Sequence, residues 1–147
     1  MTDTVASILK NKTGEIWSVP PNTTVYDAIA MMAEKAIGAL LVMQDKTLLG
    51  IISERDYARK VILQGRSSKD TLVQEIMTTP VVTVTPEQTV DESMRIITQH
   101  RIRHVPVLEH DKLVGIVSIG DLVKAIISDQ AQTIDHLHTY ITHKYPA

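Results

Sequence analysis

Hydrophobic residues occur along the chain in two spacings, and these spacings alternate in the same order in both halves. Continuous apolar runs of four or five residues fit buried strands, whereas apolar residues three or four positions apart fit one face of a helix. The apolar runs predict strands over residues 39–43 and 48–52 in the first half and over 105–108 and 113–117 in the second. A further short strand is predicted before them in each half, over 16–19 and 81–84. A helix is predicted after the first strand of each half and another after the third.

Turn and cap signals delimit these elements. Thr24 and Thr89 precede the first helix of each half and are typical N-cap residues. The predicted inner faces of these helices consist of Val25, Ile29, Met32 and Ala36 in the first half and Val90, Met94, Ile97 and Arg101 in the second. Polar connections at 44–47 and 109–112 predict a hairpin in each half. The predicted order is therefore β-α-β-β-α, twice, with a polar linker over 64–70.

The two halves are related by an internal repeat. Residues 17–62 align with 82–127 at a constant shift of 65 without a gap, and 12 of the 46 positions are identical. Most identities are apolar or turn residues, which a shared fold explains. The polar identities that lie together are Ser53 with Ser118 and Asp56 with Asp121, in the sequence Gly-Ile-x-Ser-x-x-Asp. This motif is the first candidate for chemistry beyond folding.

The Ser-x-x-Asp sequence has two physical interpretations. An Asp at the start of a helix offers two acceptor oxygens for the hydroxyls of a ribose, beside backbone N–H groups and a helix dipole that favour an anion. Ser followed three residues later by Asp, just before an apolar helical run, is also close to a capping box, which requires no ligand. The motif alone favours capping, and the two roles can coexist.

Composition narrows the classes of function. The 147 residues suit one compact domain, or two halves that share a core. With 3% aromatic residues and no Phe, the core has to be aliphatic, and no stacking platform for single-stranded nucleic acid is expected. The net charge of −2 gives no electrostatic attraction for DNA or RNA, and the absence of Cys excludes disulfides and thiol chemistry. Without an apolar span or a signal-peptide pattern, we expect a soluble cytoplasmic protein that makes no membrane contact.

A short lead-in segment precedes each repeat, over residues 5–9 and 73–77. Measured from these segments, the first half needs three more residues to reach its strand. The excess falls in the basic loop 10–14, which has no counterpart in the second half. Lys10 and Lys12 of this loop could close over the phosphates of a ligand, but we expect them to be solvated surface lysines.

Several motifs together resemble a known family. The duplicated β-α-β-β-α unit, Glu75-Ile-Met77, Ile102-Arg-His-Val-Pro-Val107 and the two Gly-Ile-x-Ser-x-x-Asp sequences look like a tandem pair of cystathionine-β-synthase (CBS) domains, or Bateman module. The resemblance covers about residues 5–128 and is specific because the motifs follow in the right order in both copies. It implies an α/β (α+β) fold with CBS repeat 1 over 5–65, CBS repeat 2 over 73–128 and a helical tail over 129–147. The layout is similar to that of stand-alone bacterial CBS-pair proteins with plant organellar relatives.

The resemblance implies a regulatory rather than a catalytic function. Such pairs bind adenosine-containing ligands such as AMP, ADP, ATP, NAD(H) or S-adenosylmethionine in clefts between the repeats, and they relay the bound state to a regulated protein. Two modules commonly associate as a disc-like homodimer. The adenine nucleotide is then a ligand, and neither a catalytic cofactor nor a metal is implied.

The resemblance also implies two unequal ligand sites, each drawing residues from both halves. The first site comprises Asp121, Ser118, Gly120, Arg103 and His104, with Ile16, Trp17, Gly38 and Ala39 from the first half. The second comprises Asp56, Ser53 and Arg55, with Val82, Thr83, Arg103 and His104 from the second half. Small residues at 38 and 39 leave room for an adenine, whereas the cations at 103 and 104 supply charge for a phosphate. We therefore expect a ligand at the Asp121 site first.

Alternative interpretations of these residues stay open. The cationic residues 101–104 also fit a solvated helix end, and Trp17 also fits a core or interface position. An enzyme is disfavoured because the chain has no Gly-x-x-x-x-Gly-Lys-Ser/Thr, His-Glu-x-x-His or Gly-x-Ser-x-Gly sequence. The remaining alternative is a ligand-independent interaction protein that regulates a partner enzyme, for example a thioredoxin-like enzyme or one of nucleotide metabolism.

The histidine-containing tail suggests a metal site or a packing surface. On a helix, His136 and His138 diverge by roughly 200°, and His143 lies about two turns from His136, so a single-ion site is not expected. The apolar stripe of the tail consists of Ile134, Leu137, Tyr140 and Ile141 and suits packing on a partner subunit.

Overall fold

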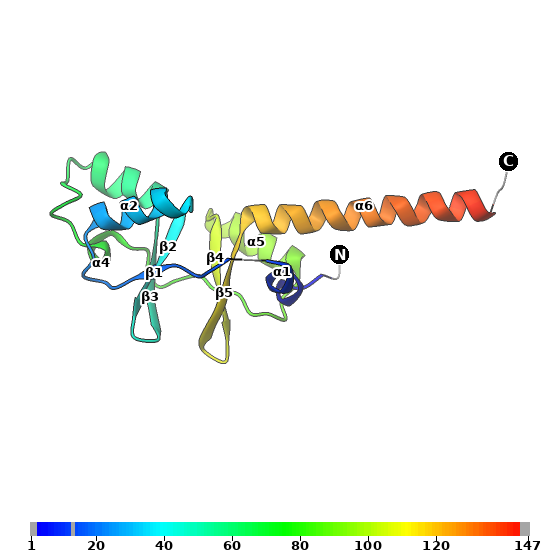
Figure 1. Cartoon of the computed structure of the whole chain (residues 1–147), viewed down its shortest axis with the longest axis horizontal. Coiled ribbons are helices and arrows are strands. Elements are labelled where there is room, and N and C mark those ends of the chain that lie inside the picture. The colour runs from blue at the N-terminus through cyan, green and yellow to red at the C-terminus, as the bar shows by residue number, and fades with distance from the viewer. Residues whose placement is uncertain (1–2, 13, 145–147) are drawn as a thin grey trace. The chain divides into compact units, whose positions relative to one another are not determined.

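The computed structural model of the chain describes residues 3–12 and 14–144, with the backbone alone at 133, 136 and 139–144. The chain forms two compact units, one made of residues 15–82 and the other of 1–14 with 83–147 (Figure 1). Each unit contains one of the two predicted helix-hairpin-helix arrangements. The α+β class predicted from the sequence is confirmed.

The unit formed by residues 15–82 has a three-stranded sheet in the order β1-β2-β3. Its elements are β1 (Ser18–Val19), α2 (Val25–Lys35), β2 (Ala39–Gln44), β3 (Thr47–Ser53), α3 (Glu54–Tyr57), the π-helical turn η1 (Ala58–Ile62) and α4 (Val73–Ile76). β1 pairs parallel to β2, and β2 pairs antiparallel to β3. The predicted hairpin is confirmed, whereas the predicted first strand is shorter than residues 16–19.

The other unit is built on the hairpin β4 (His104–Glu109) and β5 (Lys112–Ser118). Its helices are α1 (Val5–Asn11), α5 (Val90–His100) and α6 (Ile119–Lys144). The strand predicted over 81–84 is wrong as a regular strand. Only Val84 pairs with β4, through hydrogen bonds from its N–H to the Pro106 carbonyl (3.0 Å) and from the Leu108 N–H to its own carbonyl (2.9 Å).

Caps at both ends define the first helix of each repeat. The Thr24 and Thr89 hydroxyls accept hydrogen bonds from the third residue of the helix, as predicted for N-caps. Both helices end in a left-handed residue, Ala36 (φ 56°) and Arg101 (φ 54°). The prediction that Ala36 and Arg101 extend the inner face is therefore wrong, because the backbone leaves the helix there.

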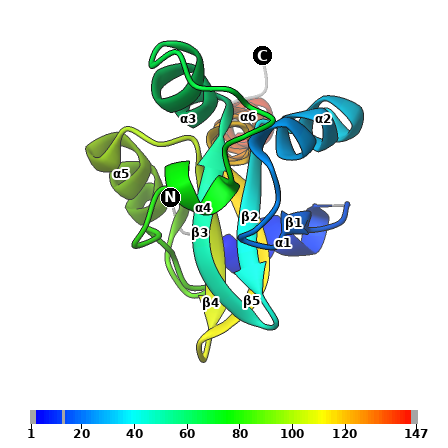
Figure 2. The ribbon, with the colours of Figure 1, turned by 90° about the vertical axis from the view of Figure 1, so that its left-hand side faces the viewer.

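Each lead-in helix packs on the hairpin of the other repeat. α4 lies against β3 (Figure 2), and α1 lies against β5. The packing is close at the glycine of each Gly-Ile-x-Ser-x-x-Asp motif. A Cβ at Gly50 would lie 2.5 Å from the Met77 sulfur, and one at Gly115 would lie 2.6 Å from a Leu9 methyl carbon. The repeated glycine thus allows the lead-in helix to approach without displacing the Met77 or Leu9 side chain.

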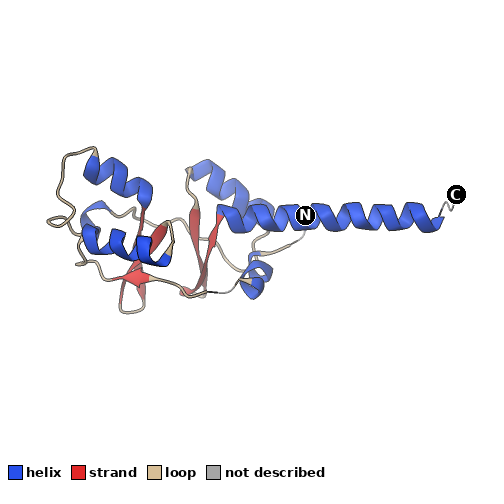
Figure 3. Ribbon diagram, turned by 45° about the horizontal axis from the view of Figure 1, so that its top comes forward, coloured by secondary structure: helices blue, strands red, loops and turns tan. Residues whose placement is uncertain are grey.

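The helix α6 begins directly after Ser118 and continues to Lys144 without interruption (Figure 3). The predicted tail is, over residues 129–144, a continuation of the second helix of the repeat. Ile127, Ile134 and Leu137 on this helix are 59%, 67% and 57% exposed. The side chains of Tyr140 and Ile141 lie outside the described residues. Among the helices described, none combines the length and the apolar character that crossing a membrane requires.

Candidate functional site

The Ser-x-x-Asp sequence of the first repeat forms a complete capping box at the start of α3. The Ser53 Oγ accepts a hydrogen bond from the Asp56 N–H (3.2 Å), and the Asp56 Oδ2 accepts one from the Ser53 N–H (2.9 Å). The Ser53 hydroxyl also donates to Oδ2 (3.0 Å). The capping interpretation is confirmed at this turn.

The second repeat has the same two bonds at the start of α6. The Asp121 N–H donates to the Ser118 Oγ (3.1 Å), and the Ser118 N–H donates to the Asp121 Oδ2 (2.9 Å). α6 has 26 residues, so its first turn carries the positive end of a long helix dipole. Both copies of the motif therefore hold a carboxylate fixed at a helix start.

The two carboxylates differ in the further groups that contact them. Asp56 Oδ1 accepts a hydrogen bond from the Thr78 hydroxyl (3.2 Å) and lies 3.1 Å from the Lys60 ammonium. Together with the capping bonds to Oδ2, both oxygens of Asp56 are engaged. Thr78 follows the lead-in helix α4, and Lys60 is four residues after Asp56 on the next turn.

Asp121 is contacted instead by a lysine from the first lead-in segment. The Lys12 Nζ lies 2.8 Å from Asp121 Oδ2 and 2.8 Å from the Ile116 carbonyl oxygen. Lys12 is on the surface, as expected, but its ammonium is not simply solvated, because it finds two acceptors on the β5–α6 corner. Among the described residues, Asp121 Oδ1 has no hydrogen-bond donor.

The ionisation of Asp121 reflects two opposing effects. Partial burial raises the pKa of Asp121 because it disfavours the charged form. Hydrogen bonds from Lys12 and from the Ser118 N–H, together with the charge of Lys12, lower it by more. The net result is a pKa below the usual range for Asp, so Asp121 is an anion throughout the physiological pH range.

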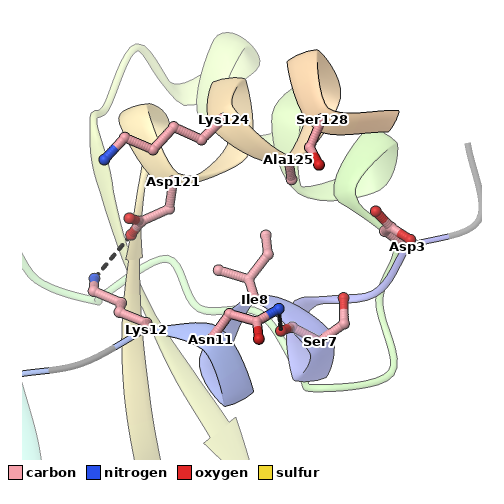
Figure 4. A pocket seen from close by; sticks show the side chains of 9 residues that line it. All are labelled: Asp3, Ser7, Ile8, Asn11, Lys12, Asp121, Lys124, Ala125 and Ser128. Atoms are coloured by element: carbon pink, nitrogen blue, oxygen red, sulfur yellow. Dashed lines mark hydrogen bonds and ion pairs between the residues drawn. The ribbon is translucent and has the colours of Figure 1, made fainter. Parts of the chain in front are cut away.

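An open pocket of about 440 Å³ lies beside Asp121, between α1 and the first turns of α6 (Figure 4). Its lining residues are Asp3, Ser7, Ile8, Asn11, Lys12, Asp121, Lys124, Ala125 and Ser128. Ile8 points into the pocket from α1, and Lys12 and Lys124 flank the carboxylate (Figure 4). The carboxylate therefore stands between two lysines at one end of a polar pocket.

Strand register places the residues before each hairpin next to the corresponding turn. His104 pairs with Ser118, and the Ile119 N–H donates to the Arg103 carbonyl (2.8 Å). The structure thus brings Arg103 and His104 to the Asp121 turn, where Gly120 also lies.

The same register applies to the first repeat. Ala39 pairs with Ser53, and the Glu54 N–H donates to the Gly38 carbonyl (3.1 Å). Gly38 and Ala39 therefore lie beside the Asp56 turn of their own unit, where Arg55 is the second residue of α3. Trp17 packs against the core of this unit, with the Lys35 ammonium 4.4 Å from its ring centre. The core interpretation of Trp17 is thus supported.

The part of the prediction that joins the two units stays a prediction. It assigns residues of the unit 15–82 to the Asp121 site, namely Ile16, Trp17, Gly38 and Ala39. It likewise joins Thr83, Arg103 and His104 to the Asp56 turn, whereas Val82 belongs to the same unit as Asp56.

Three residues that contact the carboxylates were missed or misjudged from the sequence. Lys60 had a signal, because residues four apart face each other on a helix. Thr78 and Lys12 had none, since nothing in their local sequence indicates that the lead-in segments cross to the other repeat. The metal interpretation of the tail depends on His136 and His143, whose side chains lie outside the described residues.

Comparison with known sequences identifies both repeats. A family profile described as "CBS domain" matches residues 5–62 and 73–128. The chain is 41% identical over 152 residues to the mitochondrial CBS domain-containing protein CBSX3 of Arabidopsis thaliana, covering 97% of this chain and 73% of that protein. It is 32% identical over 127 residues to the CBS domain-containing protein YhcV of Bacillus subtilis, covering 86% and 90%.

Solved structures agree with the sequence matches. A protein with CBS domains from Burkholderia ambifaria, described as a candidate signal-transduction protein, has a TM-score of 0.83 and 58% identity, with coverage of 86% and 96%. CBSX2, solved in complex with AMP, has a TM-score of 0.71 and 26% identity, with coverage of 87% and 98%. A hexameric CBS-CP12 protein from bloom-forming cyanobacteria has a TM-score of 0.73 and 29% identity, with coverage of 97% and 89%. Because the profile matches both repeats over most of its length, this chain belongs to the CBS-domain family, as a tandem pair of CBS domains.

Proposed function

We propose that the chain is a non-catalytic regulatory module that binds an adenosine-containing ligand at the Asp121 turn and relays the bound state to a partner protein. The observation that carries this proposal is the AMP complex of CBSX2, which shares the fold over 87% of this chain. The expected ligands are AMP, ADP, ATP and NAD(H), with S-adenosylmethionine as a less favoured candidate.

The contacts of the two carboxylates support Asp121 as the first site to be occupied. A ribose offers two hydroxyl donors and is best held by two carboxylate oxygens. Both oxygens of Asp56 are already engaged by capping bonds, Thr78 and Lys60. In Asp121 the capping bond from the Ser118 N–H and the contact with Lys12 both use Oδ2, so Oδ1 is available beside a pocket of about 440 Å³.

The other proposed site residues divide into cations that would bind the phosphate and small or apolar residues that would accommodate the adenine. Arg103 and His104, placed by strand register at the Asp121 turn, are proposed to contact phosphate. Gly120 leaves open space there, since a Cβ on it would meet only the Ser118 Oγ, at 3.5 Å. Adenine is proposed to lie against Ile16, Trp17, Gly38 and Ala39 of the other unit.

Calorimetric titration of the whole chain with AMP, ATP, NADH and S-adenosylmethionine tests the proposal. We expect AMP or another adenine nucleotide to bind with a dissociation constant well below about 1 mM, a free energy stronger than about −4 kcal/mol. Asp121→Ala should abolish the first binding event, and Asp56→Ala should leave it in place. If no adenosine compound binds below about 1 mM, the sensor proposal is wrong and the ligand-independent interaction protein becomes the better candidate.

A turnover assay separates the module from an enzyme. Each nucleotide that binds is incubated with the protein and followed by chromatography. We expect the nucleotide to be recovered unchanged, because the Ser118 hydroxyl and the Asp121 carboxylate at this turn are engaged in capping bonds. Steady conversion of the nucleotide would contradict the proposal.

We further propose that copies of the chain associate through α6. Ile119, Val123 and Ile127 are 37%, 40% and 59% exposed, and they recur every four residues along the helix. An aliphatic row of this kind is costly to leave in water, and a cyanobacterial relative of the same fold is hexameric. Light scattering should give at least a dimer for the chain and a smaller species for Val123→Glu/Ile127→Glu. A monomeric parent would refute the association.

A further inference from the structure

The contact between Lys12 and Asp121 involves the carboxylate to which the ribose has been assigned. The ammonium lies 2.8 Å from Asp121 Oδ2 and 2.8 Å from the Ile116 carbonyl, so it is held by one charged and one neutral acceptor. Its side chain is 34% exposed and that of Asp121 is 20% exposed. The pair is thus neither buried nor fully solvated, and a ligand that reaches Asp121 also reaches Lys12.

The position of Lys12 in the chain makes it a separate component of the site. It is the C-cap residue of α1 and has an extended backbone (φ −90°, ψ 123°). It belongs to the basic segment 10–14, which the second repeat lacks and of which Lys10 and Asn11 form the end of α1. At the Asp56 turn, the residue that comes from the lead-in segment is Thr78, whose hydroxyl carries no charge. Only the Asp121 turn has a lead-in cation among the described residues.

We propose that Lys12 is a selectivity gate that makes the Asp121 site prefer phosphorylated adenosine ligands to unphosphorylated ones. Without ligand, the ammonium compensates the charge of Asp121. When a nucleotide places its ribose on the carboxylate, the ammonium is transferred to the phosphate of that nucleotide. The inference rests on the proposed binding of an adenosine compound at Asp121.

The selectivity depends on whether the ligand offers the Lys12 ammonium a new anionic partner after it leaves Asp121. Adenosine must displace Lys12 from Asp121 and offers no anion in exchange, so the ion pair is lost to water. S-adenosylmethionine has a carboxylate only at the far end of its methionine chain, and next to the ribose it has a sulfonium cation, which Lys12 and the neighbouring Lys124 disfavour. AMP or ATP replaces the carboxylate with a phosphate, which accepts a charge-assisted hydrogen bond from lysine. The same side chain therefore opposes one ligand class and binds the other.

The reach of the side chain fits this exchange. Lys12 is anchored by its backbone at the end of α1, and four methylenes separate its ammonium from that anchor. Asp121 lies at the start of a long helix, where N–H groups and the dipole also favour an anion. A phosphate near the ribose and an ammonium released from Oδ2 would meet within the same open pocket (Figure 4).

The test compares the affinities of AMP and adenosine for the parent chain, Lys12→Met and Lys10→Met. Lys10→Met is the matched control, because it removes the same charge two residues earlier in the chain. Lys10 lies on the last turn of α1, and in the part of the chain that the structure describes it makes no contact with the carboxylate. For Lys12→Met we expect AMP to bind about tenfold more weakly, since a charge-assisted bond is lost. Adenosine should bind about twofold to fivefold more tightly, because the ion pair no longer has to be broken. Lys10→Met should change neither affinity by more than about twofold.

The outcomes separate this inference from the function on which it rests. If the parent binds AMP, Asp121→Ala abolishes binding and the AMP-to-adenosine ratio of Lys12→Met equals that of the parent, the gate is wrong and the proposed function stands. If Lys10→Met lowers the ratio as much as Lys12→Met, the effect is general electrostatics and the gate is again wrong. If the parent binds neither compound, both proposals fail. Lys12→Arg should retain most of the preference for AMP, and a loss as large as in Lys12→Met would contradict an ionic role.

Discussion

The Lys12–Asp121 contact should be measurable in the protein without any ligand. Asp121→Ala removes the carboxylate bond to the Ser118 N–H and the ion pair with Lys12, and it leaves the Ser118 N-cap bond intact. Lys12→Met removes only the ion pair and the bond to the Ile116 carbonyl. The double variant closes a thermodynamic cycle that isolates the interaction between the two side chains.

The expected losses of stability follow from the contacts that each substitution removes. Losing one arm of a capping box costs about 1 kcal/mol, and a half-exposed ion pair contributes about 0.5 kcal/mol. We therefore expect Asp121→Ala to lower the free energy of unfolding by about 1.5 kcal/mol and Lys12→Met to lower it by about 0.5–1 kcal/mol. The double variant should lose less than the sum, by a coupling free energy of about 0.5 kcal/mol.

Urea unfolding followed by far-UV circular dichroism provides the assay, and thermal melts provide a check at about 2–4 °C per kcal/mol. A coupling free energy below about 0.2 kcal/mol would refute the reasoning, because it would mean that the ion pair is not formed in solution. Repeating the cycle in about 1 M salt adds a control, since the Debye length falls to about 3 Å and the coupling should shrink.

The remaining predictions concern stability and pH. Ser93 is buried, and none of the described residues offers its hydroxyl a hydrogen-bond partner. Ser93→Ala should therefore raise the free energy of unfolding by about 1 kcal/mol, and Ala28→Ser at the equivalent position should lower it. Gly50→Ala should cost about 1–3 kcal/mol by displacing Met77, and an unchanged urea midpoint would contradict the close packing. The lowered pKa of Asp121 stabilises the fold above about pH 4 and loses that contribution as pH falls through the lower folded value. The acid limb of a urea-midpoint profile should therefore flatten in Asp121→Asn.

Much of the fold could be predicted because the same order of apolar runs, caps and turns occurs in both halves of the sequence. Both hairpins, both N-caps and the two turns at Ser53 and Ser118 follow from local patterns, and the gap-free alignment fixes their register. The sequence-based predictions were wrong at the C-terminal ends of the first helix of each repeat. At Ala36 and Arg101 the helical spacing continues in the sequence, but the backbone turns left-handed there. The spacing of side chains does not reveal where a helix ends when no Gly or Pro indicates it.

The exchange of lead-in segments could not be predicted, because it is a long-range pairing. α1 is separated from β5 by about a hundred residues, and its contact with Gly115 uses an ordinary leucine, Leu9. The glycine itself was visible as half of the repeated motif, but its reason was not. Close approach by a segment distant in sequence leaves no periodic pattern in the sequence. For the same reason, the contacts of Thr78 and Lys12 with the two carboxylates could not be predicted.

The two copies of the motif are therefore alike in what a single repeat can provide and unlike in what the other repeat contributes. Capping bonds come from within the motif, and they have the same partners and nearly the same lengths at both turns. Beyond the cap, Asp56 also meets Lys60 of its own repeat. The segment that differs is the lead-in, from which Asp56 receives a neutral hydroxyl and Asp121 an ammonium. The capped turn is therefore the same in both copies, whereas the exchanged segments differ in the residue that reaches the carboxylate. If the two sites bind differently, the difference should transfer with the lead-in segment, and Thr78→Lys would be the substitution that makes the Asp56 turn resemble its partner.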